Sequence, residues 1–182
     1  MTATTHIDRL DDGLVSESLS RATLDVFGTM LGVDAVAGER FTEKAPPHPS
    51  HGVVSLIGMA GSWAGTGVMS CSAELACKLS GRLLLAEYES VNDEVLDAMG
   101  ELTNMVIGNF KNDIEQHVGP LGLSIPTVIF GRNFVARSAT ENDWIVVPFE
   151  CEGDTLVVKV CLSPRASRPP VRGHAPPPFM VE

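Results

Sequence analysis

The longest periodic segment of the chain, residues 92–116, predicts an amphipathic helix. At about 100° per residue, its apolar residues fall on one side of the helix and its polar and small residues on the other. The apolar stripe consists of Val95, Met99, Leu102, Val106, Phe110 and Ile114. The opposite side carries Asp97, Glu101, Asn104, Gly108 and Lys111. We therefore expect the stripe to pack on a core and the polar face to remain open.

A second apolar stripe predicts a helix over residues 14–31, with Gly32 as its stop. The positions of this stripe are Val15, Leu19, Ala22, Val26 and Met30. Ser72 is a favourable N-cap residue and predicts a shorter helix that runs to about residue 85. The chain thus offers two long helices and a short one.

Runs of apolar and β-branched residues between these helices predict strands. The first hairpin pairs residues 53–60 with residues 66–71 around a glycine-rich turn, 61–65. The second hairpin pairs residues 144–151 with residues 155–162 around Gly153. A single strand is predicted over residues 125–130, with Pro126 at its edge end. Glycine accepts the positive φ that the second turn needs. Residues 33–41 are compatible with one more short strand.

Together these elements predict an α+β domain over residues 13–162: a mostly antiparallel sheet with two long helices packed on one face. The chain has 182 residues, of which 44% are hydrophobic, enough for one real core. Prolines make residues 45–51 a loop. We expect residues 1–12 and the Pro/Arg-rich residues 163–182 to be disordered.

The net charge of −10 argues against binding to nucleic acid or to an anionic membrane, because both would repel the chain. No apolar run is long enough to cross a bilayer, and the N-terminus lacks the layout of a secretory signal, so we expect a cytoplasmic protein. The cysteines show neither C-x-x-C spacing nor a partnering histidine pair, so we expect no metal site and no disulfide framework. The cysteines are Cys71, Cys77, Cys151 and Cys161. Cys77 and Cys161 lie in apolar segments, which is typical of buried residues.

The centre of the long helix reads Asp97-Ala-Met-Gly-Glu101-Leu-Thr-Asn104-Met-Val-Ile-Gly108-Asn. This pattern resembles the signature helix of the CheC/CheX family of chemotaxis response-regulator phosphatases. Residues 21–32, Arg-Ala-Thr-Leu-Asp-Val-Phe-Gly-Thr-Met-Leu-Gly, are similar to the first helix of CheX-type members, and the resemblance covers roughly residues 14–162. It implies a sheet covered by two long helices and a homodimer formed through strand edges. It also implies one active site per chain, because the counterpart in the first helix, Glu17-Ser-Leu-Ser20, has no carboxamide.

The resemblance also implies a mechanism. The chain shows no Ser-His-Asp or Cys-His constellation and no phosphate-binding glycine loop, so a nucleophile of its own is not expected. The implied substrate, a phosphorylated CheY-type receiver domain, brings its own Mg²⁺ and lysine, and this chain needs no cofactor. Asn104 would enter the receiver's site and orient the hydrolytic water, and Glu101 would pair with the receiver's lysine.

Four neighbouring residues are candidates for partner binding: Met105, Gly108, Asp97 and Lys111. A glycine inside a helix costs up to about 1 kcal/mol relative to alanine, so Gly108 indicates close approach of a partner. Gly100, toward the flank of the polar face, can instead pack on the protein's own helix or sheet. For Asp97, Lys111 and Glu94, surface pairing within the helix is the simpler interpretation.

Two other functions remain open. The same surface could bind a receiver, a flagellar switch protein or a receptor-complex protein without hydrolysis, although a pure binder does not need the Glu101/Asn104 pair. A small-molecule enzyme would require a deep apolar pocket with convergent polar groups.

Overall fold

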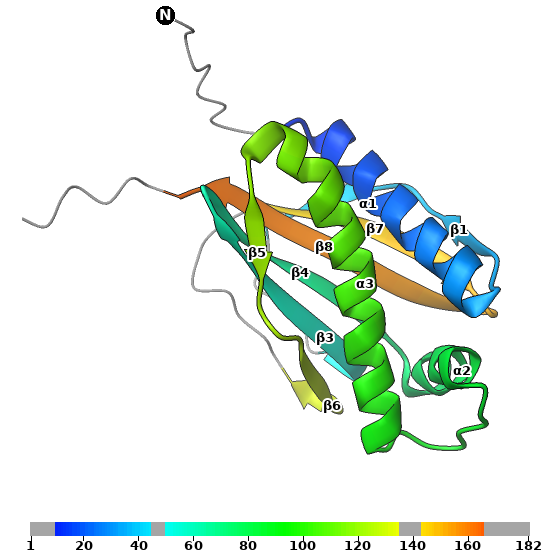
Figure 1. The fold of residues 1–182 in the computed structure, drawn as a ribbon. Coiled ribbons are helices and arrows are strands. Elements are labelled where there is room, and N and C mark those ends of the chain that lie inside the picture. Colours follow the sequence, from blue (N-terminus) through cyan, green and yellow to red (C-terminus); the bar gives the residue numbers. More distant parts are fainter. Residues whose placement is uncertain (1–9, 45–49, 135–142, 166–182) are drawn as a thin grey trace, which may run out of the picture.

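The computed structural model describes residues 10–44, 50–134 and 143–165, which form an antiparallel sheet of eight strands with helices packed against it (Figure 1). In chain order the elements are α1 (Asp12–Val26), the π-helical turn η1 (Phe27–Leu31), β1 (Ala35–Ala37), β2 (Phe41–Glu43), β3 (Ser50–Gly61), β4 (Trp63–Cys71), α2 (Ala73–Leu84), α3 (Asp93–Val118), β5 (Leu121–Leu123), β6 (Thr127–Phe134), β7 (Trp144–Cys151) and β8 (Asp154–Pro164). None of the helices in these residues is long and apolar enough to cross a membrane.

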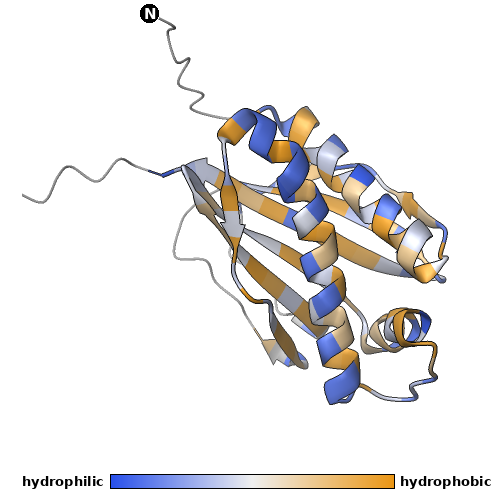
Figure 2. Ribbon diagram, viewed as in Figure 1, coloured by the Kyte–Doolittle hydropathy of each residue, from blue (hydrophilic) through white to orange (hydrophobic). Residues whose placement is uncertain are grey.

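The sheet has β8 and β4 at its centre, with β7 and β3 beside them. Strands β1 and β2 pair with the outer edge of β7, and β5 and β6 pair with the outer edge of β3. Figure 1 shows α1 and α3 side by side across one face of this sheet, with α2 near one end of it. In Figure 2, polar residues recur along the outward side of α3, above mostly apolar strands. The predicted α+β class, with two long helices on one sheet face, is confirmed.

Helix α3 forms as its pattern predicts. Its cap is Asn92, whose Oδ1 accepts a hydrogen bond from the Val95 amide at 3.0 Å. Asp93 and Glu94 follow in the first turn, where carboxylates interact favourably with the helix dipole. All six residues of the predicted stripe are fully buried. Burial of the stripe therefore fixes which face of α3 is left to solvent.

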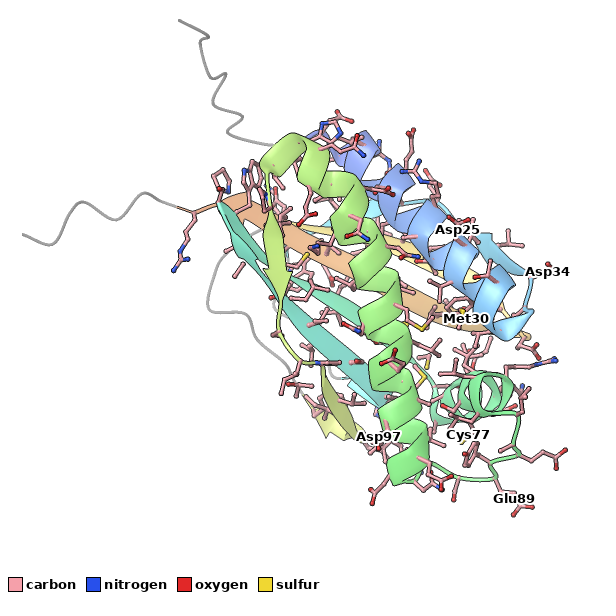
Figure 3. The ribbon with its side chains drawn as sticks, in the orientation of Figure 1. Asp25, Met30, Asp34, Cys77, Glu89 and Asp97 are labelled. Atoms are coloured by element: carbon pink, nitrogen blue, oxygen red, sulfur yellow. The ribbon has the colours of Figure 1, made fainter. Side chains whose placement is uncertain are left out.

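The prediction for the end of the first helix is wrong at Met30, which is 49% exposed. Residues Phe27–Leu31 form the π-helical turn η1, in which hydrogen bonds span five residues instead of four. This wider turn breaks the helical periodicity, so Phe27 and Leu31 point into the core and Met30 points out. Figure 3 places Met30 at the end of this helix, next to α2. The predicted stop at Gly32 is confirmed, with φ at 61°.

The first hairpin has a tighter turn than predicted. The pairing of Ala60 with Ala64 makes Trp63 the first residue of β4, so the predicted turn over residues 61–65 is wrong at its second half. The reason lies in the neighbouring strand β8. A Cβ added to Gly65 would lie 2.0 Å from the carbonyl oxygen of Cys161, so this glycine permits close strand approach and serves no turn.

The second hairpin is confirmed. Cys151 pairs with Asp154 across a two-residue turn, in which Glu152 and Gly153 both have positive φ, 52° and 81°. This is the type I′ geometry that suits the twist of paired strands. The short helix α2 is confirmed as well, since the Ser72 hydroxyl accepts from the Leu75 amide at 3.0 Å.

Several boundaries need correction. Strand β5 was not predicted, and β6 begins at Thr127 and extends to Phe134 instead of covering residues 125–130. The predicted disordered segments reach too far into the domain at both ends. Leu10 is buried at the N-terminal end, and β8 continues through Ser163 and Pro164 at the C-terminal end. Strand β3 likewise takes in residues 50 and 51 of the predicted loop. The remaining parts of these predictions, residues 1–9, 45–49 and 166–182, lie outside the described residues.

The four cysteines are buried and unpaired, and the predicted burial of Cys77 and Cys161 is confirmed. Burial raises the pKa of the Cys71 thiol to about 12, which makes it a poor nucleophile or metal ligand.

Candidate functional site

The polar face of α3 is an exposed ridge over the sheet. Asp97 and Glu101 are exposed, and Asn104, one turn further along, is half-buried. Asp97 lies near the N-terminal end of the helix (Figure 3). The i, i+3 and i, i+4 spacing of these residues brings their side chains onto neighbouring turns of one helix face. The structure therefore brings the predicted catalytic pair, Glu101 and Asn104, together on the outside of the domain.

Both members of this pair are free of polar contacts with the part of the chain that the structure describes. In the described ranges, the side chains of Glu101, Asn104 and Asp97 form no hydrogen bond or ion pair. An amide and two carboxylates without internal partners keep their full hydrogen-bonding capacity for another molecule.

The charge on this part of α3 has one sign. Between Asp93 and Gly108 the helix carries the carboxylates of Asp93, Glu94, Asp97 and Glu101 and no basic residue. Glu94 accepts a hydrogen bond from the Tyr88 hydroxyl at 2.7 Å, which differs from the pairing expected within the helix. A partner surface that meets this ridge gains from a basic group close to Glu101.

Lys111, by contrast, is already paired. Its Nζ lies 3.0 Å from Oε1 of Glu115, which confirms the predicted pairing along the helix. Glu115 also accepts from the Leu121 amide at 2.7 Å. The Leu121 amide and Lys111 lower the pKa of Glu115, so the carboxylate stays charged. These contacts join the last turns of α3 to β5, and Lys111 is less available to a partner than Asp97.

The two glycines of the helix have different environments. Gly100 is buried, and an added Cβ would lie 3.3 Å from Cγ2 of Val128 in β6. Its predicted alternative, packing against the protein's own sheet, is therefore the observed one. Gly108 is half-buried, and its added Cβ would meet only Cδ1 of Leu123, at an ordinary distance of 3.9 Å. The fold thus has no steric need for glycine at position 108.

Contacts to both other helices hold the ridge in place. Arg21 in α1 forms an ion pair with Asp113 at 2.7 Å, and Ser18 donates to the same carboxylate at 3.1 Å. Ser80 in α2 donates to the carbonyl of Val95 at 3.3 Å. Met105 is half-buried and packs against the core. A site built on a helix anchored in this way holds its side chains at fixed positions.

Two exposed apolar residues beside the ridge were missed by the sequence analysis. Ile125, in the link between β5 and β6, is 87% exposed, and Phe130 in β6 is 49% exposed. Their neighbour Pro126 lies 3.8 Å from an added Cβ on Gly100, which places this segment directly beside α3. Periodicity could not reveal them, because it treats an apolar residue in a strand as a core residue.

A cavity of about 680 Å³ lies between α2 and the loop that follows it. Four of its charged lining residues form two ion pairs, Arg82 with Glu152 at 2.9 Å and Lys78 with Glu74 at 2.8 Å. The cavity does not include Glu101 or Asn104. Most of its lining residues are charged or polar, so it is not the deep apolar pocket that a small-molecule enzyme requires. The described residues also contain no cluster of side chains suited to hold a metal ion.

The chain is similar to known proteins over most of its length. A family model described as Chemotaxis phosphatase CheX matches residues 53–150, which include all of α3. The CheY-P phosphatase CheX of Thermotoga maritima is 29% identical over 129 residues, which cover 70% of this chain and 82% of the relative. The family and the phosphatase class predicted from the sequence are confirmed.

Solved structures share the fold. A CheC-like superfamily protein from Shewanella sp. PV-4 has a TM-score of 0.73 at 26% identity, over 82% of this chain and 97% of that one. The crystal structure of the CheX–CheY–BeF3–Mg²⁺ complex from Borrelia burgdorferi contains a chain with a TM-score of 0.71 at 23% identity, over 85% of this chain and 99% of that one. The roles of Glu101 and Asn104 remain predictions.

Proposed function

This chain belongs to the chemotaxis phosphatase CheX family, and on that premise we propose that it hydrolyses the aspartyl phosphate of a CheY-type receiver domain. The observation that carries the proposal is the Glu101/Asn104 pair on the open face of an anchored helix, without a polar partner among the described residues. The name of the Thermotoga maritima relative, a CheY-P phosphatase, supports the choice of substrate. So does the complex of a related fold with CheY.

In the proposed reaction, a water oxygen forms a bond to phosphorus while the bond from phosphorus to the receiver's aspartate oxygen breaks. The products are inorganic phosphate and the free aspartate. The receiver's Mg²⁺ neutralises charge on the transferred group, so the main task left to this chain is to position the water. The carboxamide of Asn104 can donate to one water and accept from it at the same time.

Glu101 has a separate role in the proposal. One turn before Asn104, its carboxylate pairs with the lysine of the receiver's site and sets how deeply α3 enters. The surrounding acids, Asp93, Glu94 and Asp97, favour the approach of that cation. Asp97 and Met105 then contact the receiver at the rim, and Gly108 leaves room for its backbone.

The test is phosphate release from a phosphorylated CheY-type receiver with Mg²⁺ present. We expect Asn104→Ala to lower the stimulated rate at saturating receiver by at least about 100-fold, the scale of a lost positioning contact. Asn109→Ala is the matched control, because Asn109 is an exposed asparagine on the same helix and lies off the polar face. Full activity of Asn104→Ala would rule out the proposed role of this residue.

The same assay separates the phosphatase from a non-catalytic binding module. A binding module would hold the activated receiver without accelerating phosphate release in the wild-type protein. We favour catalysis because neither Asn104 nor Glu101 has a polar partner within residues 10–44, 50–134 and 143–165, and binding alone does not require this pair.

We further propose a homodimer formed through sheet edges. In the described ranges, β1, β2, β5 and β6 each pair with one neighbour, so both edges of the sheet present unpaired backbone groups. Exposed edges tend to pair with a second copy, which satisfies these groups by an isologous contact.

A further inference from the structure

We propose that Ile125 and Phe130 form an apolar docking strip that contacts the receiver domain beside its phosphorylation site. This inference rests on the proposed function and adds to it the surface that supplies affinity. The strip consists of these two residues, which belong to the β5–β6 segment and are 87% and 49% exposed.

The strip lies along the ridge formed by the polar face of α3. Contacts of the neighbouring residues fix its direction: Leu123 is next to Gly108, and Pro126 and Val128 are next to Gly100. The segment therefore runs antiparallel to α3. Asn104 lies midway between the two glycines, four residues from each, so it lies alongside the link that contains Ile125.

Phe130 continues the strip toward the first turns of α3. It pairs with Val53 of β3, whose side chain is buried under the helices. Directly opposite residues of an antiparallel pair project to the same face, so Phe130 projects to the helix side of the sheet. It remains half-exposed because β6 is at the sheet edge, beyond the cover that α3 provides.

Ile125 is fixed in its exposed position by its neighbour. The Ser124 amide donates to the carbonyl of Gly58, and the Gly58 amide donates to the Ser124 hydroxyl, both at 2.9 Å. The same hydroxyl donates to the carbonyl of Ile125 at 2.9 Å. A rigid apolar side chain on a clamped backbone loses little entropy on binding, as an interface anchor should.

The area of the ridge shows why a docked receiver must reach this strip. Residues 97–108 of α3 span about 16 Å, and a helix is about 10 Å wide, so the ridge offers on the order of 160 Å². A specific protein–protein complex buries about 800 Å² on each partner. A receiver seated on Glu101 and Asn104 therefore covers adjacent surface, and the strip is apolar and belongs to the segment that packs against α3 through Pro126 and Val128. The carboxylates of Asp97 and Glu101 on α3 match a partner whose apolar patch adjoins a lysine.

The test is the dissociation constant for a CheY-type receiver activated with beryllofluoride and Mg²⁺, measured for Ile125→Ser and Phe130→Ser. Leu85→Ser is the matched control, because Leu85 is 93% exposed at the end of α2, away from the β5–β6 segment and from both sheet edges. We expect about tenfold weaker binding for each strip variant, the usual scale for an interface anchor, and no change for the control. The circular dichroism spectra of all three variants should match the wild-type spectrum, so that a change in affinity reports on docking and not on loss of the fold.

Two outcomes overturn the inference. If the strip variants bind within twofold of wild type while Asn104→Ala abolishes phosphate release, the strip is not the docking surface and the proposed function stands. If wild type binds no activated receiver, the inference and the proposed function fall together.

Discussion

Gly108 is the position where stability and activity should change in opposite directions. Replacement by alanine adds one methyl group to the exposed side of α3. The added Cβ would lie 3.9 Å from Cδ1 of Leu123, an ordinary van der Waals distance, and would meet no other atom within 4 Å. The native fold therefore accepts the methyl group without strain.

The stability gain follows from helix propensity. Glycine in a helix interior is about 0.8–1.0 kcal/mol less favourable than alanine. For a protein of this size, 1 kcal/mol corresponds to a rise in melting temperature of about 2–4 °C. We therefore expect Gly108→Ala to melt at a higher temperature than wild type, as measured by circular dichroism or calorimetry.

The loss of function follows from the proposed docking. A methyl group in a close contact costs about 1–3 kcal/mol when neighbouring atoms cannot yield. At 1.4 kcal/mol per factor of ten, affinity for the activated receiver should fall about five- to 150-fold. Titration with a beryllofluoride-activated receiver measures this change.

The matched control is Gly28→Ala in η1. Gly28 is exposed, and its added Cβ would meet no atom within 4 Å. This variant should bind the receiver as wild type does. If Gly108→Ala is more stable and binds with wild-type affinity, the gap at position 108 is not used for docking. That result would refute the interpretation that Gly108 permits close approach of the receiver.

Two further predictions concern the core and the assembly. Ser55 is fully buried in β3, and among the described side chains its Oγ lacks a hydrogen-bond partner. Ser55→Ala should therefore raise the free energy of unfolding by about 1 kcal/mol, as measured by urea titration. A loss of stability would indicate an internal partner for the hydroxyl. The proposed edge-paired homodimer should give twice the monomer mass in light scattering at micromolar concentration, and a monomer at all concentrations would exclude it.

Short-range patterns in the sequence account for the helices, their caps and the exposure of the polar pair. The stripe of α3, the caps at Asn92 and Ser72 and the turn at Gly153 depend on residues within a few positions of each other. Such short-range patterns are visible in a linear sequence. The position of Glu101 and Asn104 on the open face of α3 followed from the same periodicity, because a helix that buries one face must expose the other.

Long-range packing accounts for the roles of the glycines and for the exposure of the apolar surface residues. Gly100 and Gly108 look alike in sequence, but Val128 packs against one and leaves the other open. Gly65 looked like a turn residue until the carbonyl of Cys161 was found against it. Met30 and Ile125 have apolar side chains typical of core residues, yet both are exposed. The π-helical turn η1 places Met30 on the surface, and the hydrogen bonds between Ser124 and Gly58 do the same for Ile125. Each of these outcomes depends on contacts or hydrogen-bond geometry that no spacing along the chain encodes, because packing brings together residues that are distant in sequence.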